Sequence, residues 1–217
     1  LLHFDTMNNP AHRPGQDHGL DLQMLSYDEG LTWSVPSKLE FAGKYAYENY
    51  GALIGPSNGI FNKETNVTYF MGHNGYESGG FLYFSNSNDR TKWTMSKTIK
   101  GMNECSIAFL NATMNDRIIM SCRTGVANQH RRAKLIFSAH GELIGNIEYP
   151  DIYDNDPGCQ GSIINGGGAN NILYTSNAND YTDRKNMTIK RSLNGGKSWD
   201  IFRNVWEGPS GYSQLTV

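Results

Sequence analysis

Apolar positions along this chain recur in short runs rather than at helical spacing. No stretch places apolar residues at i, i+3, i+4 and i+7 over three turns, the pattern of an amphipathic helix. Strand-like runs instead alternate with clusters of Gly, Asn and Asp, which predicts an all-β sandwich, barrel or propeller. The predicted strands cover 20–25, 67–71, 81–85, 106–110, 117–122, 134–138, 162–165, 171–176 and 187–192.

A repeated turn motif favours the propeller among these architectures. Residues 26–33 read Ser-Tyr-Asp-Glu-Gly-Leu-Thr-Trp, and 192–199 repeat the pattern with Asn for Asp and Ser for Thr. A copy one residue short spans 87–93, and a weaker copy spans 138–141. The Asp or Asn side chain is expected to accept hydrogen bonds from turn amides, while Gly supplies a positive φ. The Trp is expected to pack between neighbouring sheets, and such repetition indicates a propeller.

Composition and charge argue against several classes of function. The chain has 217 residues, enough for one substantial domain, and includes 24 Gly and 12% aromatic residues, which suits a turn-rich β-protein. A net charge of -2 gives no electrostatic case for binding nucleic acid or an anionic membrane surface. No apolar run reaches the roughly 18 residues of a membrane-spanning helix. The three cysteines are an odd number, which argues against a full disulfide framework.

The repeated turn resembles the Asp-box of the sialidase superfamily. The resemblance extends over essentially the whole chain and implies a six-bladed β-propeller of the sialidase type. Residues 1–217 would then form a single, incomplete propeller domain. Because Asp-boxes lie on the rim away from the active site and also occur in propellers without activity, the motif indicates the fold rather than the chemistry.

Cleavage of a sialoside makes specific demands on a site. The substrate carries a carboxylate on its anomeric carbon, and planar guanidinium groups are the best partners for it. That charge would repel a carboxylate nucleophile, whereas sialidases use a Tyr, which a neighbouring Glu activates. A further carboxylic acid must protonate the leaving oxygen. The site therefore requires several Arg, a Tyr–Glu pair and one additional acid.

Glu104 and Arg123 lie in segments that resemble those supplying the Glu partner of the nucleophile and one carboxylate-binding Arg. If the chain reverses at 113–114, Glu104 lies directly opposite Arg123 across a hairpin. An ordinary cross-strand ion pair would explain the same pattern, but the resemblance favours a functional one. The same hairpin brings Cys105 to face Cys122, and a disulfide between them is a hypothesis.

Three further residues follow in the order of the family. Arg184 precedes a strand and an Asp-box, which implies a second carboxylate-binding Arg. Gln160 lies in a segment resembling one that reaches the glycan, and a turn role is its alternative. Tyr212, in Ser210–Leu215, occupies the position of the nucleophile, although a Tyr is usually a packing residue.

The loop before the first Asp-box is expected to carry the general acid. Asp17 fits best, because Asp21 lies at the start of a strand, and a turn-forming Asp beside Gly is the alternative reading of Asp17. His18 is a rival acid that the family pattern does not require. Arg13 is the candidate to replace an Arg that usually follows the first strand.

The chain departs from the family pattern at both ends. It begins at Leu1-Leu2-His3-Phe4, past the segment that normally carries the first Arg of the triad, and it stops at Val217, before a ring-closing strand. We therefore expect a fragment, a processed form or a partial gene model. Two arginines should bind the carboxylate more weakly than three, by about 1.5–3 kcal/mol.

The leading hypothesis is a retaining exo-α-sialidase that acts on sialylated glycans, glycoproteins or gangliosides. Tyr212 would attack with help from Glu104, Asp17 would serve as acid and then base, and Arg123 and Arg184 would hold the carboxylate. This chemistry requires no metal or other cofactor, and the sequence shows no His or Cys cluster with ligand spacing. The alternatives are a trans-sialidase with the same residues and a non-catalytic, sialoglycan-binding propeller. The compartment stays open, with a secreted or lysosomal location favoured over the cytoplasm.

Overall fold

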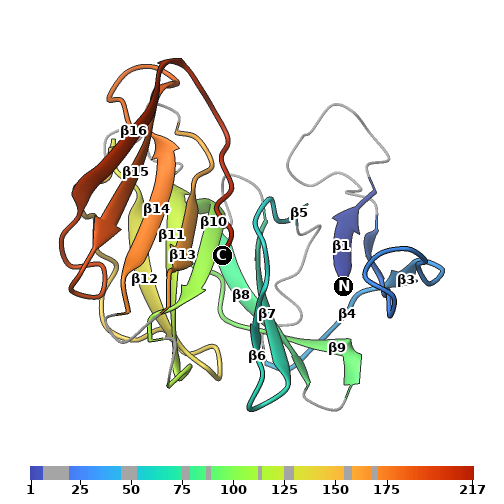
Figure 1. The fold of residues 1–217 in the computed structure, drawn as a ribbon. Helices are drawn as coiled ribbons and strands as arrows, with labels where there is room; N and C mark the ends of the chain where they lie inside the picture. Colours follow the sequence, from blue (N-terminus) through green and yellow to red (C-terminus); the bar gives the residue numbers. More distant parts are fainter. Residues whose placement is uncertain are drawn as a thin grey trace.

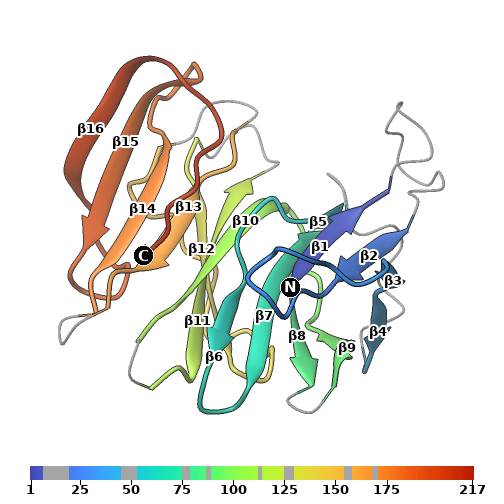
Figure 2. The ribbon, with the colours of Figure 1, turned by 45° about the vertical axis from the view of Figure 1, so that its right-hand side comes forward.

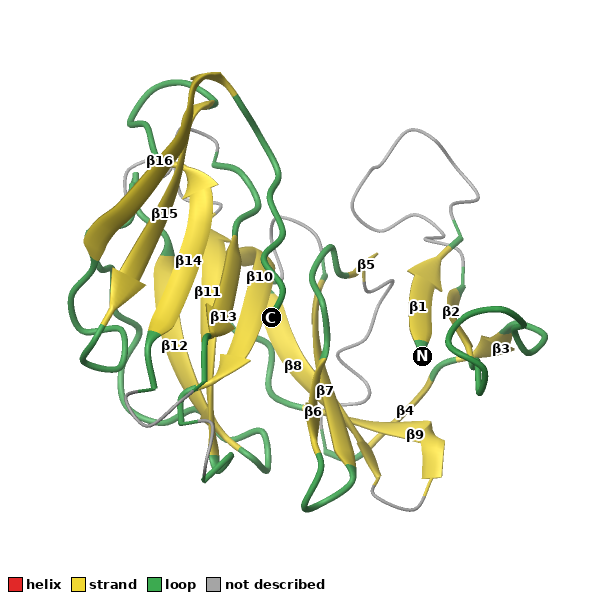
Figure 3. Ribbon diagram, viewed as in Figure 1, coloured by secondary structure: helices red, strands yellow, loops and turns green. Residues whose placement is uncertain are grey.

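The computed structural model describes residues 1–6, 20–44, 53–74, 79–86, 89–111, 114–124, 130–153, 158–167 and 171–217. Every helix or strand element in these ranges is a β-strand, and the strands form four sheets arranged as an arc (Figures 1 and 2). Within the same ranges, no helix is long and apolar enough to cross a membrane. Figure 3 shows only strands and loops among the described residues.

The four sheets follow one another along the chain. The first contains β1 (Leu2–Asp5), β2 (Asp21–Met24) and β3 (Ser37–Lys38). The second contains β4 (Glu40–Ala42), β9 (Asp89–Met95), β8 (Gly80–Asn86), β7 (Val67–His73), β5 (Leu53–Ile54) and β6 (Ile60–Asn62). The third contains β10 (Met102–Phe109), β11 (Arg117–Thr124) and β12 (Ala133–Ser138). The fourth contains β13 (Ser162–Asn165), β14 (Leu173–Ala178), β15 (Lys185–Ser192) and β16 (Asp200–Pro209).

The nine strand ranges predicted from the sequence all coincide with observed strands; 162–165 has the bounds of β13, and the bounds of the others are shifted. Strand β16 was not predicted, because almost all its positions are exposed and no in-and-out alternation marks it. Strand β4 follows β3 closely along the chain, but it belongs to the second sheet, where it pairs in parallel with β9. Local sequence patterns do not predict a pairing between strands so far apart in sequence.

The apolar core lies between consecutive sheets, as in blades packed face to face. Burial of each large apolar side chain contributes about 1.5–3 kcal/mol, and truncation of Trp93 to Ala would cost about 3–5 kcal/mol. The Trp93 indole also donates to Gln23 Oε1 at 3.0 Å, which links the first two sheets. The buried side chains between the first and second sheets are Leu39, Phe81, Tyr83, Trp93 and Met95. Those between the second and third sheets include Tyr69, Met71, Leu82, Ile107, Met120, Leu135 and Phe137. Those between the third and fourth sheets are Ala108, Ile119, Ile163 and Leu173.

The Asp-box turns have the predicted hydrogen bonds. In the first, Asp28 Oδ1 accepts from the Thr32 amide at 2.8 Å, and Ser26 Oγ accepts from the Gly30 amide at 2.8 Å. In the last, Asn194 Oδ1 accepts from the Ser198 amide at 3.0 Å. The identical role of the Ser and Asp or Asn side chains confirms that both segments are copies of one turn.

The weaker copies retain part of this bonding. Ser138 Oγ accepts from the amides of His140 (3.2 Å) and Glu142 (3.1 Å), as Ser26 does in the first copy. Asp89 Oδ1 accepts from the Thr91 amide at 2.9 Å, while 87 and 88 lie outside the described residues. The turn hydrogen bonds are therefore kept in the copy at 138–141, whereas residues 89–93 of the other copy belong to strand β9.

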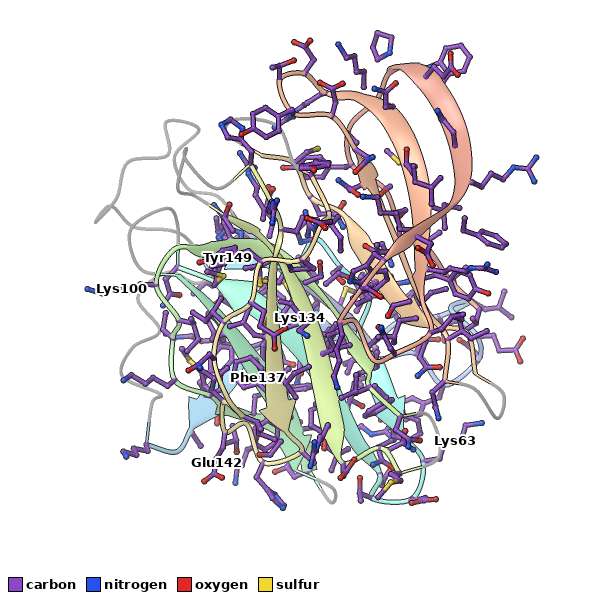
Figure 4. All side chains as sticks on the ribbon, turned by 90° about the vertical axis from the view of Figure 1, so that its left-hand side faces the viewer. Lys63, Lys100, Lys134, Phe137, Glu142 and Tyr149 are labelled. Atoms are coloured by element: carbon purple, nitrogen blue, oxygen red, sulfur yellow. A yellow bond between two sulfur atoms is a disulfide. The ribbon has the colours of Figure 1, made fainter. Side chains whose placement is uncertain are left out.

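The Trp of the motif packs between sheets in one of the two full copies. Trp199 packs against the core between the third and fourth sheets, as predicted, whereas Trp33 is 42% exposed. Lys134 lies on β12 (Figure 4). Its Nζ donates to the Gly196 carbonyl at 3.3 Å, which links the third sheet to the last Asp-box turn.

The strand directions separate two rims of the arc. Strands β1 and β14 point to one end, and β10 and β15 point to the other (Figure 1). The turns that contain the Asp-boxes follow β2 and β15 at the second end. The start of β10, the end of β11 and the start of β15 lie at the first end, which we call the site rim.

Candidate active site

Glu104 is placed by a β-bulge at the start of β10. Asn103 pairs with Arg123 and Cys105 with Cys122, so Glu104 is the extra residue between them. Its φ is 30°, a conformation that non-glycine residues rarely adopt. The Asn103 side chain supports this conformation by accepting from the Glu104 amide at 2.8 Å. The prediction that Glu104 stands directly opposite Arg123 is therefore wrong in register, because the bulge places Asn103 there.

Arg123 nevertheless pairs with Glu104. Its Nη1 donates to Glu104 Oε2 at 2.6 Å, and the Arg123 side chain is only 4% exposed. Breaking such a buried pair leaves an uncompensated charge, which typically costs about 3–5 kcal/mol. A disulfide joins Cys105 to Cys122 directly beneath this pair, as the hypothesis from the sequence held. The bulge, the ion pair and the disulfide together fix the orientation of the Glu104 carboxylate.

Tyr212 lies on the segment that follows β16. Its hydroxyl donates to Glu104 Oε1, although the two residues are far apart in sequence. Partial burial, followed by the hydrogen bond and the negative charge of Glu104, raises the pKa of Tyr212 to about 12. Tyr212 is consequently a neutral phenol at physiological pH, with its proton directed at a carboxylate.

Arg184 completes the group at the start of β15. Its guanidinium carbon lies 5.8 Å from the centroid of the Tyr212 ring, and its Nη2 donates to the Gly158 carbonyl at 3.0 Å. The Arg184 carbonyl accepts from the Ser210 amide at 2.8 Å, which fixes the segment just before Tyr212. The structure thus brings together Glu104, Arg123, Arg184 and Tyr212, predicted from four separate segments.

Gln160 occupies a more buried position than its predicted role suggests. The side chain is 2% exposed, and its Oε1 accepts from the Ser213 amide at 3.1 Å. Its Nε2 is buried and has no hydrogen-bond partner among the described residues. In this structure Gln160 supports the segment that carries Tyr212, and its predicted contact with the glycan stays a prediction.

Two other predicted residues, Asp17 and Arg13, lie outside the described residues. The loop that contains them connects β1 to β2. At the site rim these two strands carry a pair of carboxyl groups that the sequence analysis did not predict. Asp5 of β1 stands directly opposite Asp21 of β2. Burial, and then the proximity of Asp21, raises the pKa of Asp5 to about 7, although the Ile54 amide donates to it at 2.9 Å. Sequence analysis missed Asp5, because only the register of the two strands brings it to Asp21.

The chemistry of the group follows from its charges. A neutral phenol hydrogen bonded to a carboxylate is a nucleophile with its base in place. Two guanidinium groups flank this pair and favour an anionic ligand, in particular a planar carboxylate. Among the described residues, no group of three or more His, Cys, Asp or Glu side chains is arranged to hold a metal ion.

Comparisons with known proteins agree with this architecture. The family model for a BNR repeat-like domain matches residues 9–217. The Hadza microbial sialidase Hz136 is 22% identical, with a TM-score of 0.67 over 91% of this chain and 39% of that chain. The K499G mutant of NanB sialidase from Streptococcus pneumoniae is 21% identical, with a TM-score of 0.73 over 91% and 30%. The intramolecular trans-sialidase from Ruminococcus gnavus is 18% identical, with a TM-score of 0.70 over 90% and 43%.

These likenesses establish the fold. The four sheets correspond to part of a sialidase-type β-propeller, as the sequence predicts. The chain spans 30% to 43% of the length of these three structures.

Proposed function

The chain belongs to the family of BNR repeat-like domains. On this premise we propose that it is a sialidase that hydrolyses terminal α-linked sialic acid with retention of configuration. The observation that carries the proposal is the hydrogen bond from the Tyr212 hydroxyl to Glu104 Oε1. A tyrosine held in this way suits attack on an anomeric carbon that itself bears a carboxylate.

In the first step, the Tyr212 oxygen forms a bond to the anomeric carbon while its proton passes to Glu104, and the bond from that carbon to the leaving oxygen breaks as Asp17 protonates this oxygen. In the second step, water that Asp17 deprotonates attacks the anomeric carbon, the bond to Tyr212 breaks, and Glu104 returns the proton to the Tyr212 oxygen. The raised pKa of Tyr212, about 12, means that almost no phenolate exists beforehand. Proton transfer must therefore accompany attack, as in general-base activation of a nucleophile. Arg123 orients the Glu104 carboxylate from the opposite side at 2.6 Å, so that the other oxygen stays directed at Tyr212.

Arg123 and Arg184 would hold the substrate carboxylate. Both lie at the site rim, at the end of β11 and at the start of β15 respectively. Their positive charge also stabilises the anionic character that develops on Tyr212 as its proton leaves. In this proposal Asp17 protonates the leaving oxygen and later deprotonates the attacking water, Arg13 contacts the substrate, and Gln160 positions the segment that carries Tyr212.

The test is release of fluorophore from an aryl α-sialoside. Tyr212→Phe removes the nucleophilic oxygen, so we expect kcat/KM to fall at least about a thousandfold. Tyr27→Phe is the matched control, because Tyr27 is 90% exposed in the first Asp-box turn, at the opposite rim. Equal activity of Tyr212→Phe and the parent chain would contradict the proposal. A folded parent chain that binds sialosides without turnover would instead indicate a sialoglycan-binding propeller.

A further inference from the structure

Arg132 is a fully buried arginine directly before β12, the last strand of the third sheet. Its Nε donates to Ser121 Oγ and its Nη2 donates to the Ser121 carbonyl, each at 3.1 Å. Its Nη1 donates to the Cys159 carbonyl at 2.7 Å. Complete burial of a guanidinium is uncommon, because its removal from water is costly. One planar group therefore bonds to two segments, β11 and the residues that precede β13.

The second of these segments contacts the candidate active site at both of its ends. We call residues 158–160 the support segment. The Gly158 carbonyl accepts from Arg184 Nη2 at 3.0 Å. Gln160 Oε1 accepts from the Ser213 amide, directly after the proposed nucleophile, at 3.1 Å. All three residues of the support segment are buried and belong to no strand, so side-chain contacts of this kind fix its position.

Cys159, in the middle of the support segment, lies between Arg132 and the segment that carries the nucleophile. Its Sγ lies 3.9 Å from the point where a Cβ would stand on Gly211. On the other side, a Cβ added to Gly161 would lie 3.2 Å from Arg132 Cζ and 2.6 Å from the Ser176 carbonyl oxygen. The chain after the support segment thus passes close to the guanidinium, an approach that glycine permits.

This arginine links the two sheets that share the candidate active site. Glu104 and Arg123 belong to the third sheet, and Ser121 lies two residues before Arg123 on the same face of β11. Arg184 directly precedes β15 and Tyr212 follows β16, both of which are strands of the fourth sheet. A shift of the support segment relative to β11 would therefore move the second pair of residues away from the first.

We propose that Arg132 is a positioning residue, which holds the support segment against β11 and so places Tyr212 relative to Glu104. Arg132 is completely buried and acts only through the residues that it holds. Its planar fork bonds to both segments at once, which the single ammonium group of a lysine does not reproduce. The effect on catalysis rests on the proposed sialidase function, whereas the position of the segment can be measured without turnover.

The kinetic test compares Arg132→Lys with the parent chain on an aryl α-sialoside. We expect kcat to fall about tenfold to a hundredfold, because a misplacement of about 1 Å at the reacting atoms costs rates of this order. The rate is divided by the concentration of folded protein, so a loss of stability alone does not lower it. Arg131→Lys is the matched control, because Arg131 is 40% exposed and pairs with Asp151. A kcat of Arg132→Lys equal to that of the control would overturn the proposal.

Hydrogen exchange measures the positioning itself. The amides of Ser210 and Ser213 donate to the Arg184 carbonyl and to Gln160, so a peptide that covers 210–215 reports on this support. In Arg132→Lys we expect its protected amides to exchange at least about tenfold faster, whereas the amides of β11 keep the rate of the parent chain. Unchanged exchange at 210–215, or an equal rise in both peptides, would overturn the positioning role.

Ser121→Ala is a second, milder variant for the case that Arg132→Lys does not fold. It removes the Oγ that accepts from Arg132 Nε and leaves the Ser121 carbonyl in place. We expect exchange at 210–215 to rise about two- to tenfold, and unchanged exchange would overturn the proposal. If the parent chain hydrolyses no sialoside, the hydrolysis proposal fails, and the role of Arg132 is then judged by hydrogen exchange alone.

Discussion

The disulfide between Cys105 and Cys122 should supply a measurable part of the stability of this chain. We consider the double variant Cys105→Ala/Cys122→Ala, which removes the cross-link at a sequence separation of 17. In the chain-entropy account, a loop of this length restricts the unfolded state by about 3 kcal/mol. For a chain of this size, that corresponds to a lower melting temperature by about 6–12 °C.

Thermal unfolding followed by circular dichroism measures this difference. Cys159→Ala is the matched control, because Cys159 is buried and carries a free thiol. Reductant should lower the melting temperature of the parent chain and of the control, but not that of the double variant. Three reactive thiols in the unreduced, denatured parent chain would refute the reasoning, and so would a double variant that melts within about 1 °C of the control.

Three further changes test other parts of the site. Arg123→Lys loses the planar fork, so KM for an aryl sialoside should rise about tenfold, and an unchanged KM would argue against carboxylate binding there. Gln160→Ala leaves the Ser213 amide without its acceptor, so kcat should fall several-fold with a smaller change in KM. Changes of equal size in kcat and KM would contradict a positioning role for Gln160. Burial raises the pKa of Asp5 from 3.8 to about 7, so the bound proton stabilises the fold fully below about pH 4, and this contribution is lost as the pH rises through 7. Asp5→Asn should therefore be neutral in urea unfolding near pH 4 but stabilising near pH 8, by about 1–2 kcal/mol after allowance for partial exposure; the opposite trend would show that Asp5 is ionised in the fold.

Local patterns predicted much of the fold. The short strands and the Asp-box turns follow from local runs and motifs. The four residues Glu104, Arg123, Arg184 and Tyr212 follow from the resemblance of their segments to the sialidase pattern. The structure brings these four together because each lies close to the terminus of a strand at the site rim: Glu104 near the start of β10, Arg123 near the end of β11, Arg184 just before β15 and Tyr212 after β16. Strand polarity is thus enough to gather residues that are distant in sequence.

Other features depend on interactions that no local pattern carries. The bulge at Glu104 shifts the register by one residue, so that Asn103 pairs with Arg123 across the hairpin. The pairing of Asp5 with Asp21 requires the register of β1 and β2.

The central claim is that Tyr212 is the nucleophile, and covalent trapping tests it most directly. A 2,3-difluorosialic acid would react by forming a bond between the Tyr212 oxygen and the anomeric carbon, with departure of fluoride and transfer of the phenolic proton to Glu104. Intact-mass and peptide analysis should then find one sialosyl group on Tyr212 in the parent chain and none in Tyr212→Phe. A sialosyl group on another residue, or no adduct on a folded chain that hydrolyses sialosides, would contradict the account.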